Sequence, residues 1–322
     1  MIQVFPLFRR PALALVPLGA ALCLLAPVPA WGALLGGLAL GLAGGNLHAD
    51  RTPRIAHFLL QASVIGLGAG MRLGEVARAG LHSLGITFFG ILLTLSLGRW
   101  LGRRLGLSAD TALLISGGTA ICGGSAIAAL AGTLKPRAHD LAVALVTVFL
   151  LNAVALLVFP PIGRAFGLTP EQFGWWAALA IHDTSSVVGA GLAYGGAALA
   201  VATTVKLARA LWIAPVTFWF AHRRARTGTD GGERGAIAFP WFILGFLAVA
   251  AAVTFLALPP ALTHGISFAA QRTLGATLFL IGAGVTRPAL RAAGARPLAL
   301  GLGLWIVVAT ASLAAVKTGL IG

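Results

Sequence analysis

The segment Ser116-Gly-Gly-Thr-Ala-Ile-Cys-Gly-Gly-Ser125 places four glycines and three hydroxyl side chains inside the apolar run 109–133. Each glycine weakens a helix by roughly 1 kcal/mol relative to alanine, and lipid offers no water to main-chain groups that a break releases. The pattern therefore predicts a discontinuous helix whose break lines a cavity, where helix N-termini and free N–H groups attract anions. The alternative is a close contact between helices made by small residues.

The composition of the chain predicts further membrane spans on both sides of this segment. Of the 322 residues, 58% are hydrophobic and 10% are charged, and the mean hydropathy is +0.94. Because a spanning helix needs about 20 apolar residues, we predict an all-α polytopic membrane protein and exclude a water-soluble globule. Eleven apolar runs are candidate transmembrane helices: 11–28, 30–46, 56–71, 81–98, 109–133, 139–162, 173–195, 198–220, 238–258, 268–286 and 297–316.

The first of these runs has a second interpretation. It follows Arg9 and Arg10 and ends at Val28-Pro29-Ala30, which is also the pattern of a signal peptide with its cleavage site. We expect a span here, and the sequence leaves cleavage open.

The distribution of charge predicts the orientation. With eleven spans, fifteen of the 23 Lys and Arg residues lie on the side of the N-terminus, six lie on the other side, and two lie inside a span. Cytoplasmic loops carry the excess of basic residues, so we predict a bacterial inner-membrane protein with a cytoplasmic N-terminus. The net charge of +15 is then an orientation signal, and we expect no nucleic-acid partner.

One polar connection divides the chain. Residues 221–237 form the long polar segment AHRRARTGTDGGERGAI on the predicted cytoplasmic side, and its glycine-rich polar sequence is typical of a flexible linker. We therefore expect an N-terminal membrane part at 1–220 and a C-terminal membrane part at 238–322.

A short internal repeat is also present. Residues 68–80 (GAGMRLGEVARAG) and 282–294 (GAGVTRPALRAAG) have equal length and share their first three and last two residues. The two copies fall on opposite sides of the predicted membrane, as in the inverted repeats of secondary transporters. Coincidence in a chain rich in glycine and alanine is the alternative.

The run 173–195 carries an ionisable pair. Asp183 is the one acidic residue in the middle of any predicted span, and His182 precedes it. A charge at this depth is costly unless it faces a cavity or a partner, and histidine exchanges a proton near neutral pH. We predict that His182 and Asp183, with Thr184 and Ser185, couple transport to a proton or Na⁺. Alternatively, Asp183 only neutralises Lys206 or Arg209.

The run 198–220 contributes two cations. Lys206 and Arg209 are three residues apart, which places them on one helix face. Two buried cations exceed what one carboxylate compensates, so we expect them to attract a negative substrate. Snorkelling toward an interface is the alternative, although both residues lie near the middle of the run.

The candidate site therefore combines residues from three runs. Its predicted substrate-binding residues are Ser116, Gly117, Thr119, Cys122, Gly123, Gly124, Ser125, Lys206 and Arg209. Asn152 either faces the same cavity or bonds a neighbouring helix. The two cysteines, Cys23 and Cys122, indicate neither a disulfide framework nor a metal cluster, and no nucleotide, haem or metalloprotease motif is present, so we expect no cofactor.

Five segments together resemble a known family. They are GLGAGMRL at 66–73, SGGTAICGGSAIAA at 116–129, AIHDTSSVVGAG at 180–191, VKLARALWIAP at 205–215 and LFLIGAGV at 278–285. In this order they are similar to the bacterial inner-membrane proteins named as sulfate exporters, over most of the chain from about residue 30. The resemblance implies a fold like that of the bile acid:sodium symporter and cation/proton antiporter superfamily, with inverted repeats and crossed, discontinuous helices. One departure is that the broken segments here are the fifth and seventh runs, whereas that superfamily pairs equivalent helices of two five-span repeats.

The sequence thus predicts a secondary transporter of a small anion, such as sulfate, another sulfur oxyanion or an organosulfonate, that works by alternating access. The alternative is a cation/proton antiporter in which Asp183 carries the ion and Lys206 competes with it. A remote alternative is an intramembrane enzyme using His182, Asp183 and either Ser185 or Cys122. Adjacent helical residues point about 100° apart, so His182 and Asp183 form no orienting pair unless the helix is broken, and we expect no enzyme. The expected partners are the bilayer and the anion, and a homodimer is left open.

Overall fold

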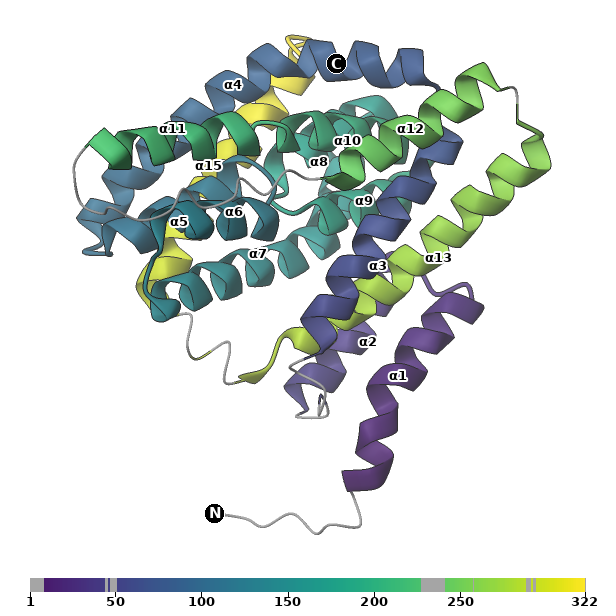
Figure 1. Cartoon of the computed structure of the whole chain (residues 1–322), viewed down its shortest axis with the longest axis horizontal. Coiled ribbons are helices and arrows are strands. Elements are labelled where there is room, and N and C mark those ends of the chain that lie inside the picture. The colour runs from purple at the N-terminus through teal and green to yellow at the C-terminus, as the bar shows by residue number, and fades with distance from the viewer. Residues whose placement is uncertain are drawn as a thin grey trace. The chain divides into compact units, whose positions relative to one another are not determined.

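A computed structural model describes residues 9–43, 46, 51–226, 241–256, 258–287, 291 and 294–321. In this part of the chain every regular element is a helix (Figure 1), which confirms the predicted all-α class. The helices form two compact units, each assembled from two separate parts of the chain. The first unit takes Met1–Leu73 and Phe242–Arg291, and the second takes Gly74–Trp241 and Ala292–Gly322.

The first unit is organised around one long helix, against which the N-terminal helices of the chain pack. Its elements are α1 (Arg9–Leu25), α2 (Ala30–Leu42), α3 (Thr52–Leu67), the 3-10 turn η2 (Gly68–Gly70), α12 (Trp241–Phe255) and the central α13 (Pro260–Gly284). Backbones approach closely where α2 crosses α13, because a Cβ added to Gly37 would overlap the main chain at Phe279. Small residues at helix contacts are a general device of membrane bundles.

The two Gly-Ala-Gly copies lie in this first unit. Gly68–Gly70 forms η2 at the end of α3, and Gly282 to Gly284 ends α13. Gly66 faces Ala270 and Gly70 faces Ser267, so α3 and α13 run antiparallel and their Gly-Ala-Gly ends point in opposite directions. The second copy continues through 288–290 and 292–293, which lie outside the described residues.

The second unit contains the remaining helices and all predicted site residues. Its elements are α4 (Leu73–Arg104), α5 (Ala109–Ala120), α6 (Gly124–Leu134), α7 (Ala138–Ala165), α8 (Pro170–Ala180), α9 (Thr184–Tyr194), α10 (Gly196–Ala210), α11 (Ile213–Arg226) and α15 (Ala295–Lys317). In Figure 1 they run from blue through green, with α15 in yellow. Their apolar core includes Leu114, Ile127, Val148 and Leu300, contributed by four different helices.

The lengths of the helices fit a membrane protein. Five helical segments are long and apolar enough to cross a bilayer: Leu73–Arg104, Ala138–Ala165, Gly196–Arg223, Pro260–Gly284 and Ala295–Lys317. Each remaining predicted run coincides with a shorter helix or with a pair of half-helices. The total of eleven spans stays a prediction, as does the division at 221–237, because residues 227–240 lie outside the described part.

The run 109–133 is broken where the glycines predict it. Helix α5 ends at Ala120, and α6 begins at Gly124 after a three-residue turn. Gly123 has a φ of +70°, and a Cβ on it would lie 2.9 Å from Cβ of Asp183. Glycine is therefore required here both by its backbone conformation and by the close approach of a second segment.

The run 173–195 is broken as well, and this break meets the first. Helix α8 ends at Ala180 and α9 begins at Thr184, with extended backbone at Ile181 and Asp183. The contact between Gly123 and Asp183 brings the two breaks together inside the second unit. Two discontinuous helices thus meet at their interruptions.

Replacing Gly123 by alanine tests this geometry. The left-handed backbone alone costs a residue with a Cβ roughly 1–2 kcal/mol, and contact with Asp183 adds to that cost, so the melting temperature in detergent should fall. Gly132→Ala is the matched control, because Gly132 lies within α6 with open space around it and alanine there should be neutral or stabilising. Equal melting temperatures for the two variants would contradict the break described here.

Candidate functional site at two helix breaks

Arg209 connects the two broken helices. Its buried guanidinium group donates from Nε to the Ala120 carbonyl at 2.6 Å and from Nη2 to the Thr119 carbonyl at 3.1 Å, both at the end of α5. Nη1 donates to the Leu179 carbonyl at 2.5 Å, at the end of α8. The planar fork of arginine suits this task, because its donors diverge toward acceptors on two elements.

Lys206 satisfies the second break from the same face of α10. Its ammonium group is fully buried and donates to the Ile181 carbonyl at 2.7 Å and to the Ala178 carbonyl at 3.4 Å. The last carbonyls of a helix have no partner within the helix and carry its negative dipole end. Lys206 and Arg209 therefore place positive charge on the C-terminal ends of α5 and α8.

This arrangement differs from the expectation that both cations are free to meet a substrate. Main-chain carbonyls occupy most of their donors, and among the described residues Asp183 forms no salt bridge with either of them. A sequence can indicate that a charged side chain is buried, but it does not indicate the hydrogen-bond acceptor of that side chain. Main-chain carbonyls at a helix break are acceptors that every residue type provides. A direct role of Lys206 and Arg209 in binding an anion stays a prediction.

The second halves of the two broken helices, α6 and α9, are capped differently at their N-terminal ends. Asp183 caps α9, where its carboxylate accepts hydrogen bonds from the main-chain N–H of Ser185, at 3.0 Å, and from the Ser185 hydroxyl. Helix α6 has no side-chain cap, because Gly123 occupies its N-cap position. Gly124 and Ser125, which follow, are only half-buried. The N-cap residue thus gives the first N–H groups of α6 no acceptor, and this positive helix end lies beside Asp183.

Several buried polar atoms around the breaks have no hydrogen-bond partner among the described residues. They include Oγ1 of Thr119, Nδ2 of Asn152 and both ring nitrogens of His182. Oδ1 of Asn152 accepts from the main-chain N–H of Asp183 at 3.1 Å, which fixes this amide next to the second break. Buried polar groups are nearly always satisfied, so these atoms point to a polar guest such as water or a substrate.

An aromatic wall borders His182. Its ring lies 6.3 Å from that of Trp305 in an edge-to-face arrangement, and Trp305 stacks on Phe159 at 5.7 Å, which in turn stacks on Trp176 at 4.2 Å. Sequence reasoning identified Asn152 as a candidate but missed Trp305, because a tryptophan in an apolar run is ordinary. Thr147 and Thr203 also have buried hydroxyls without a partner among the described residues, and the sequence did not single them out because threonine is common in helices.

The other predicted residues divide between the breaks and the packing around them. Cys122 is buried in the first interruption, and Thr184 is buried at the start of α9, directly after the second. Ser116 lies away from them: its hydroxyl donates within α5 to the Ala112 carbonyl at 2.5 Å, and it packs at Gly98 of α4. Gly117 packs against Leu130 of α6. Ser116 and Gly117 therefore hold helices together in this structure, although the sequence pattern placed them in the binding site.

Comparisons with known proteins place this architecture. Residues 26–301 match the family described as conserved hypothetical protein 698. The chain belongs to this family. A UPF0324 membrane protein of Bdellovibrio bacteriovorus is 51% identical over 94% of the chain and 93% of the relative. A second, of Geobacter sulfurreducens, is 48% identical over 88% and 90%, and a third, of Porphyromonas gingivalis, is 48% identical over 88% and 85%.

These matches support the prediction of a bacterial membrane protein. The relatives of this conserved hypothetical 698 member are named as bacterial membrane proteins, and together with its apolar helices they show a membrane-embedded protein. No solved structure matches the chain. The similarity to sulfate exporters and to the symporter superfamily is not among the findings of these comparisons.

Arg209→Ala tests whether this side chain holds the breaks together. The substitution leaves at least three buried carbonyls without a donor, at about 1–3 kcal/mol each, so the free energy of unfolding should fall by more than about 3 kcal/mol. Arg209→Lys keeps the charge without the fork and should lie between Arg209→Ala and the wild type. Lys317→Ala is the control, since exposed Lys317 also donates to a carbonyl, that of Phe166, at 2.9 Å. Thermal unfolding that is the same for Arg209→Ala and Lys317→Ala would exclude this role.

Proposed function

We propose that this protein is a secondary active transporter of a small anion, working by alternating access and coupled to H⁺ or Na⁺. The observation that carries the proposal is the meeting of two broken helices at Gly123 and Asp183. Transporters place their sites at such discontinuities near the bilayer midplane, where the main chain can line a cavity. The sulfur oxyanions and organosulfonates follow only from the sequence resemblance.

The charges at the breaks favour an anion. Lys206 and Arg209 bring two buried positive charges, whereas Asp183 brings one negative charge, so the site accommodates a further negative charge. Because carbonyl groups hold both cations, Lys206 and Arg209 would attract the anion through their electrostatic field and not through direct hydrogen bonds. Direct hydrogen bonds to the anion would come from the open N-terminus of α6 at Gly124 and Ser125, since helix N-termini bind anions through N–H groups and dipole.

The unpartnered polar atoms add neutral donors at the same place. Asn152 offers Nδ2, Thr119 offers its hydroxyl, and His182 offers a ring N–H. A tetrahedral oxyanion has several acceptor oxygens and would satisfy donors arriving from different helices. Cys122 completes the lining without adding charge.

The position of Asp183 suggests how transport is coupled. An anion at the start of α6 would lie beside this carboxylate, and two negative charges in a buried site repel each other. Proton uptake by Asp183, or a cation bound with Thr184 and Ser185, would remove that repulsion. Binding of the anion would then favour binding of the coupling ion, which is the linkage that a symporter needs.

Alternating access needs two parts that move relative to each other. The antiparallel pair α3 and α13, with its Gly-Ala-Gly ends pointing in opposite directions, is compatible with an inverted repeat, and two compact units are compatible with a moving and a static part. In this proposal the chain has eleven spans in the bacterial inner membrane and a cytoplasmic N-terminus, as the loop charges predict.

Asp183→Asn tests the coupling. In proteoliposomes, the substitution should abolish sulfate accumulation driven by an imposed proton or Na⁺ gradient, because the titratable carboxylate is gone, while sulfate exchange without a gradient continues. Glu171→Gln removes an exposed acid in the first turn of α8 and should transport like the wild type. Gradient-driven accumulation by Asp183→Asn would refute the coupling role.

A cation/proton antiporter is the second candidate. It is favoured by the position of Lys206, which donates to the carbonyl of Ile181, two residues before Asp183; a bound cation would compete with this ammonium group. The enzyme alternative gains no support, since the ring nitrogens of His182 contact neither a nucleophile nor a carboxylate among the described residues.

Substrate screening separates the two transport functions. Sulfate, sulfite, thiosulfate and taurine should raise the melting temperature of the purified protein and exchange across proteoliposomes, and the shift should shrink in Lys206→Met because the field at α6 weakens. Na⁺ and Li⁺ without these anions should have little effect. Flux of Na⁺ or Li⁺ against protons, with no anion flux, would reject the anion transporter in favour of the antiporter.

A further inference from the structure

A groove of about 700 Å³ lies in the second unit, away from the helix breaks. It is bounded by one side of α4 from Phe88 to Arg103, by the first turn of α5, and by α11 with Trp212 just before it. None of the residues that meet at Gly123 and Asp183 lines it. Its contents are therefore separate from the proposed transport site.

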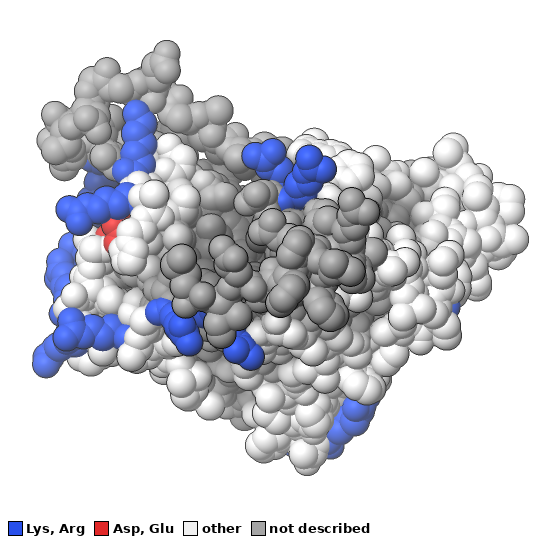
Figure 2. Space-filling view, turned by 90° about the horizontal axis from the view of Figure 1, so that it is seen from below, with Lys and Arg blue, Asp and Glu red and all other residues white. Residues whose placement is uncertain are grey.

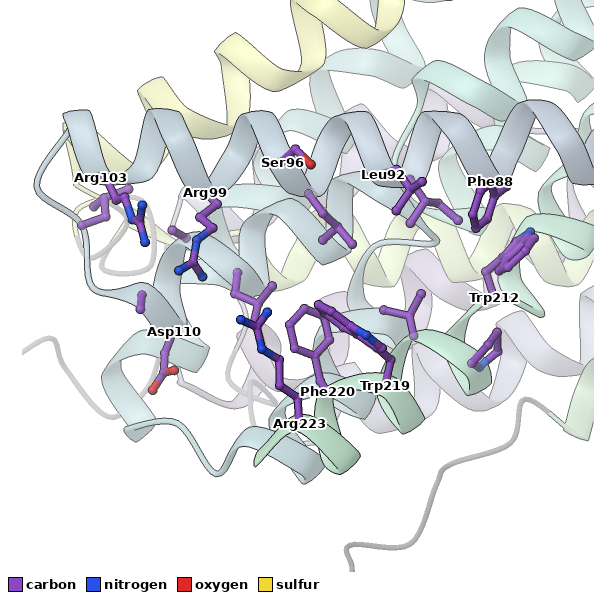
Figure 3. A pocket seen from close by; sticks show the side chains of 18 residues that line it. Phe88, Leu92, Ser96, Arg99, Arg103, Asp110, Trp212, Trp219, Phe220 and Arg223 are labelled. Atoms are coloured by element: carbon purple, nitrogen blue, oxygen red, sulfur yellow. The ribbon is translucent and has the colours of Figure 1, made fainter. Parts of the chain in front are cut away.

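The two ends of this groove differ in chemistry. Arg99, Arg103 and Arg223 gather at one end with the single acid Asp110, whereas Phe88 and Trp212 close the other end (Figure 3). On the face drawn in Figure 2, Lys and Arg side chains appear at several places, most of them toward the left, and acidic side chains show in one small area. The groove is thus amphipathic along its length, with a net positive end.

The dimensions of the groove match one leaflet of a bilayer. Phe88 and Arg103 are fifteen residues apart in α4, which is about 22 Å at 1.5 Å per residue. Half of a bilayer's hydrocarbon core measures about 15 Å, and the headgroup region adds roughly 6 Å. Arg103 is in the last turn of α4, after the predicted span 81–98.

Contacts of α4 with Trp212 and with α5 border the groove. Nε1 of Trp212 donates to Oγ1 of Thr87 at 3.0 Å at the apolar end, and Phe88 lies 5.4 Å from the Trp212 ring. Gly102 of α4 packs directly on Ala112 of α5. These contacts fix the two borders of the groove on either side of its apolar middle.

We propose that this groove binds one anionic phospholipid of the surrounding leaflet. Its phosphate lies on Arg99, Arg103 and Arg223, and an acyl chain runs past Leu92 toward Phe88 and Trp212. Guanidinium groups hold phosphate oxygens in pairs, and basic pockets between spanning helices recognise anionic headgroups. Asp110 lies at the basic end, where a glycerol headgroup can donate hydrogen bonds to its carboxylate.

The charge of the groove selects against other lipids. A zwitterionic choline headgroup would bring its cation toward three arginines, whereas phosphatidylglycerol or cardiolipin adds no positive charge. Inorganic phosphate could meet the same guanidinium groups but would leave the apolar part unfilled, so it should bind much more weakly. Lipid binding therefore requires both ends of the groove.

The test compares lipids and variants on the full-length protein. Native mass spectrometry and thermal unfolding in nanodiscs should show retention of phosphatidylglycerol, and a higher melting temperature than in phosphatidylcholine alone. The triple variant Arg99→Gln, Arg103→Gln, Arg223→Gln should bind phosphatidylglycerol at least about tenfold more weakly, which corresponds to about 1.4 kcal/mol. Arg104→Ala is the matched control, because Arg104 lies over the Trp100 ring and does not line the groove; it should bind like the wild type.

A second variant keeps the test independent of charge and of folding. Leu92→Trp fills the apolar middle while all three arginines remain, and it should lower lipid retention without lowering stability in phosphatidylcholine. Equal binding of phosphatidylglycerol and phosphatidylcholine would overturn the proposal. Equal effects of the triple variant and Arg104→Ala, or full replacement of the lipid by inorganic phosphate, would do so too.

Discussion

Hydrogen bonding of the main chain at hydrocarbon depth is the constraint on which this structure depends. Interrupting α5/α6 and α8/α9 releases carbonyl groups that lipid cannot satisfy, and an unsatisfied buried acceptor is costly. Arg209 and Lys206 supply the missing donors from one face of α10. Their charges are also placed on the negative ends of two helix dipoles, so a single helix stabilises both interruptions.

This solution leaves the opposite ends of the breaks available for function. The C-terminal ends of α5 and α8 are saturated by cations, whereas the N-terminal end of α6 begins at a glycine without a cap. The N-terminal end of α9 carries its own carboxylate at Asp183. A positive helix end and an ionisable acid therefore meet at one contact, between Gly123 and Asp183. The C-terminal helix ends are therefore held by the two cations, whereas the N-terminal helix ends meet at this contact.

Sequence reasoning predicted the parts of this site whose chemistry is unusual in lipid. A glycine cluster, an acid and two cations stand out in apolar runs. The glycines predicted the break in the run 109–133, whereas no sequence pattern singled out the contact of Gly123 with Asp183. The acceptors of Lys206 and Arg209 could not be predicted, because main-chain carbonyls have no sequence signature. Ser116 shows another limit of the sequence: its hydroxyl donates within its own helix, as any helical serine can, and its role in binding stays a prediction. The sequence also did not predict that each compact unit is assembled from two distant segments, because every span has a similar apolar pattern.

The most direct measurement is an experimental structure of the protein in a bilayer with selenate, the heavier analogue of sulfate, at an acidic pH. Our account predicts selenium density at the start of α6, within hydrogen-bond distance of the Gly124 and Ser125 N–H groups and facing Asn152 and His182. Lys206 and Arg209 should remain on their carbonyls. Selenate bound instead directly to Lys206 or Arg209 with the breaks rearranged, or the absence of any anion between the two breaks, would contradict it.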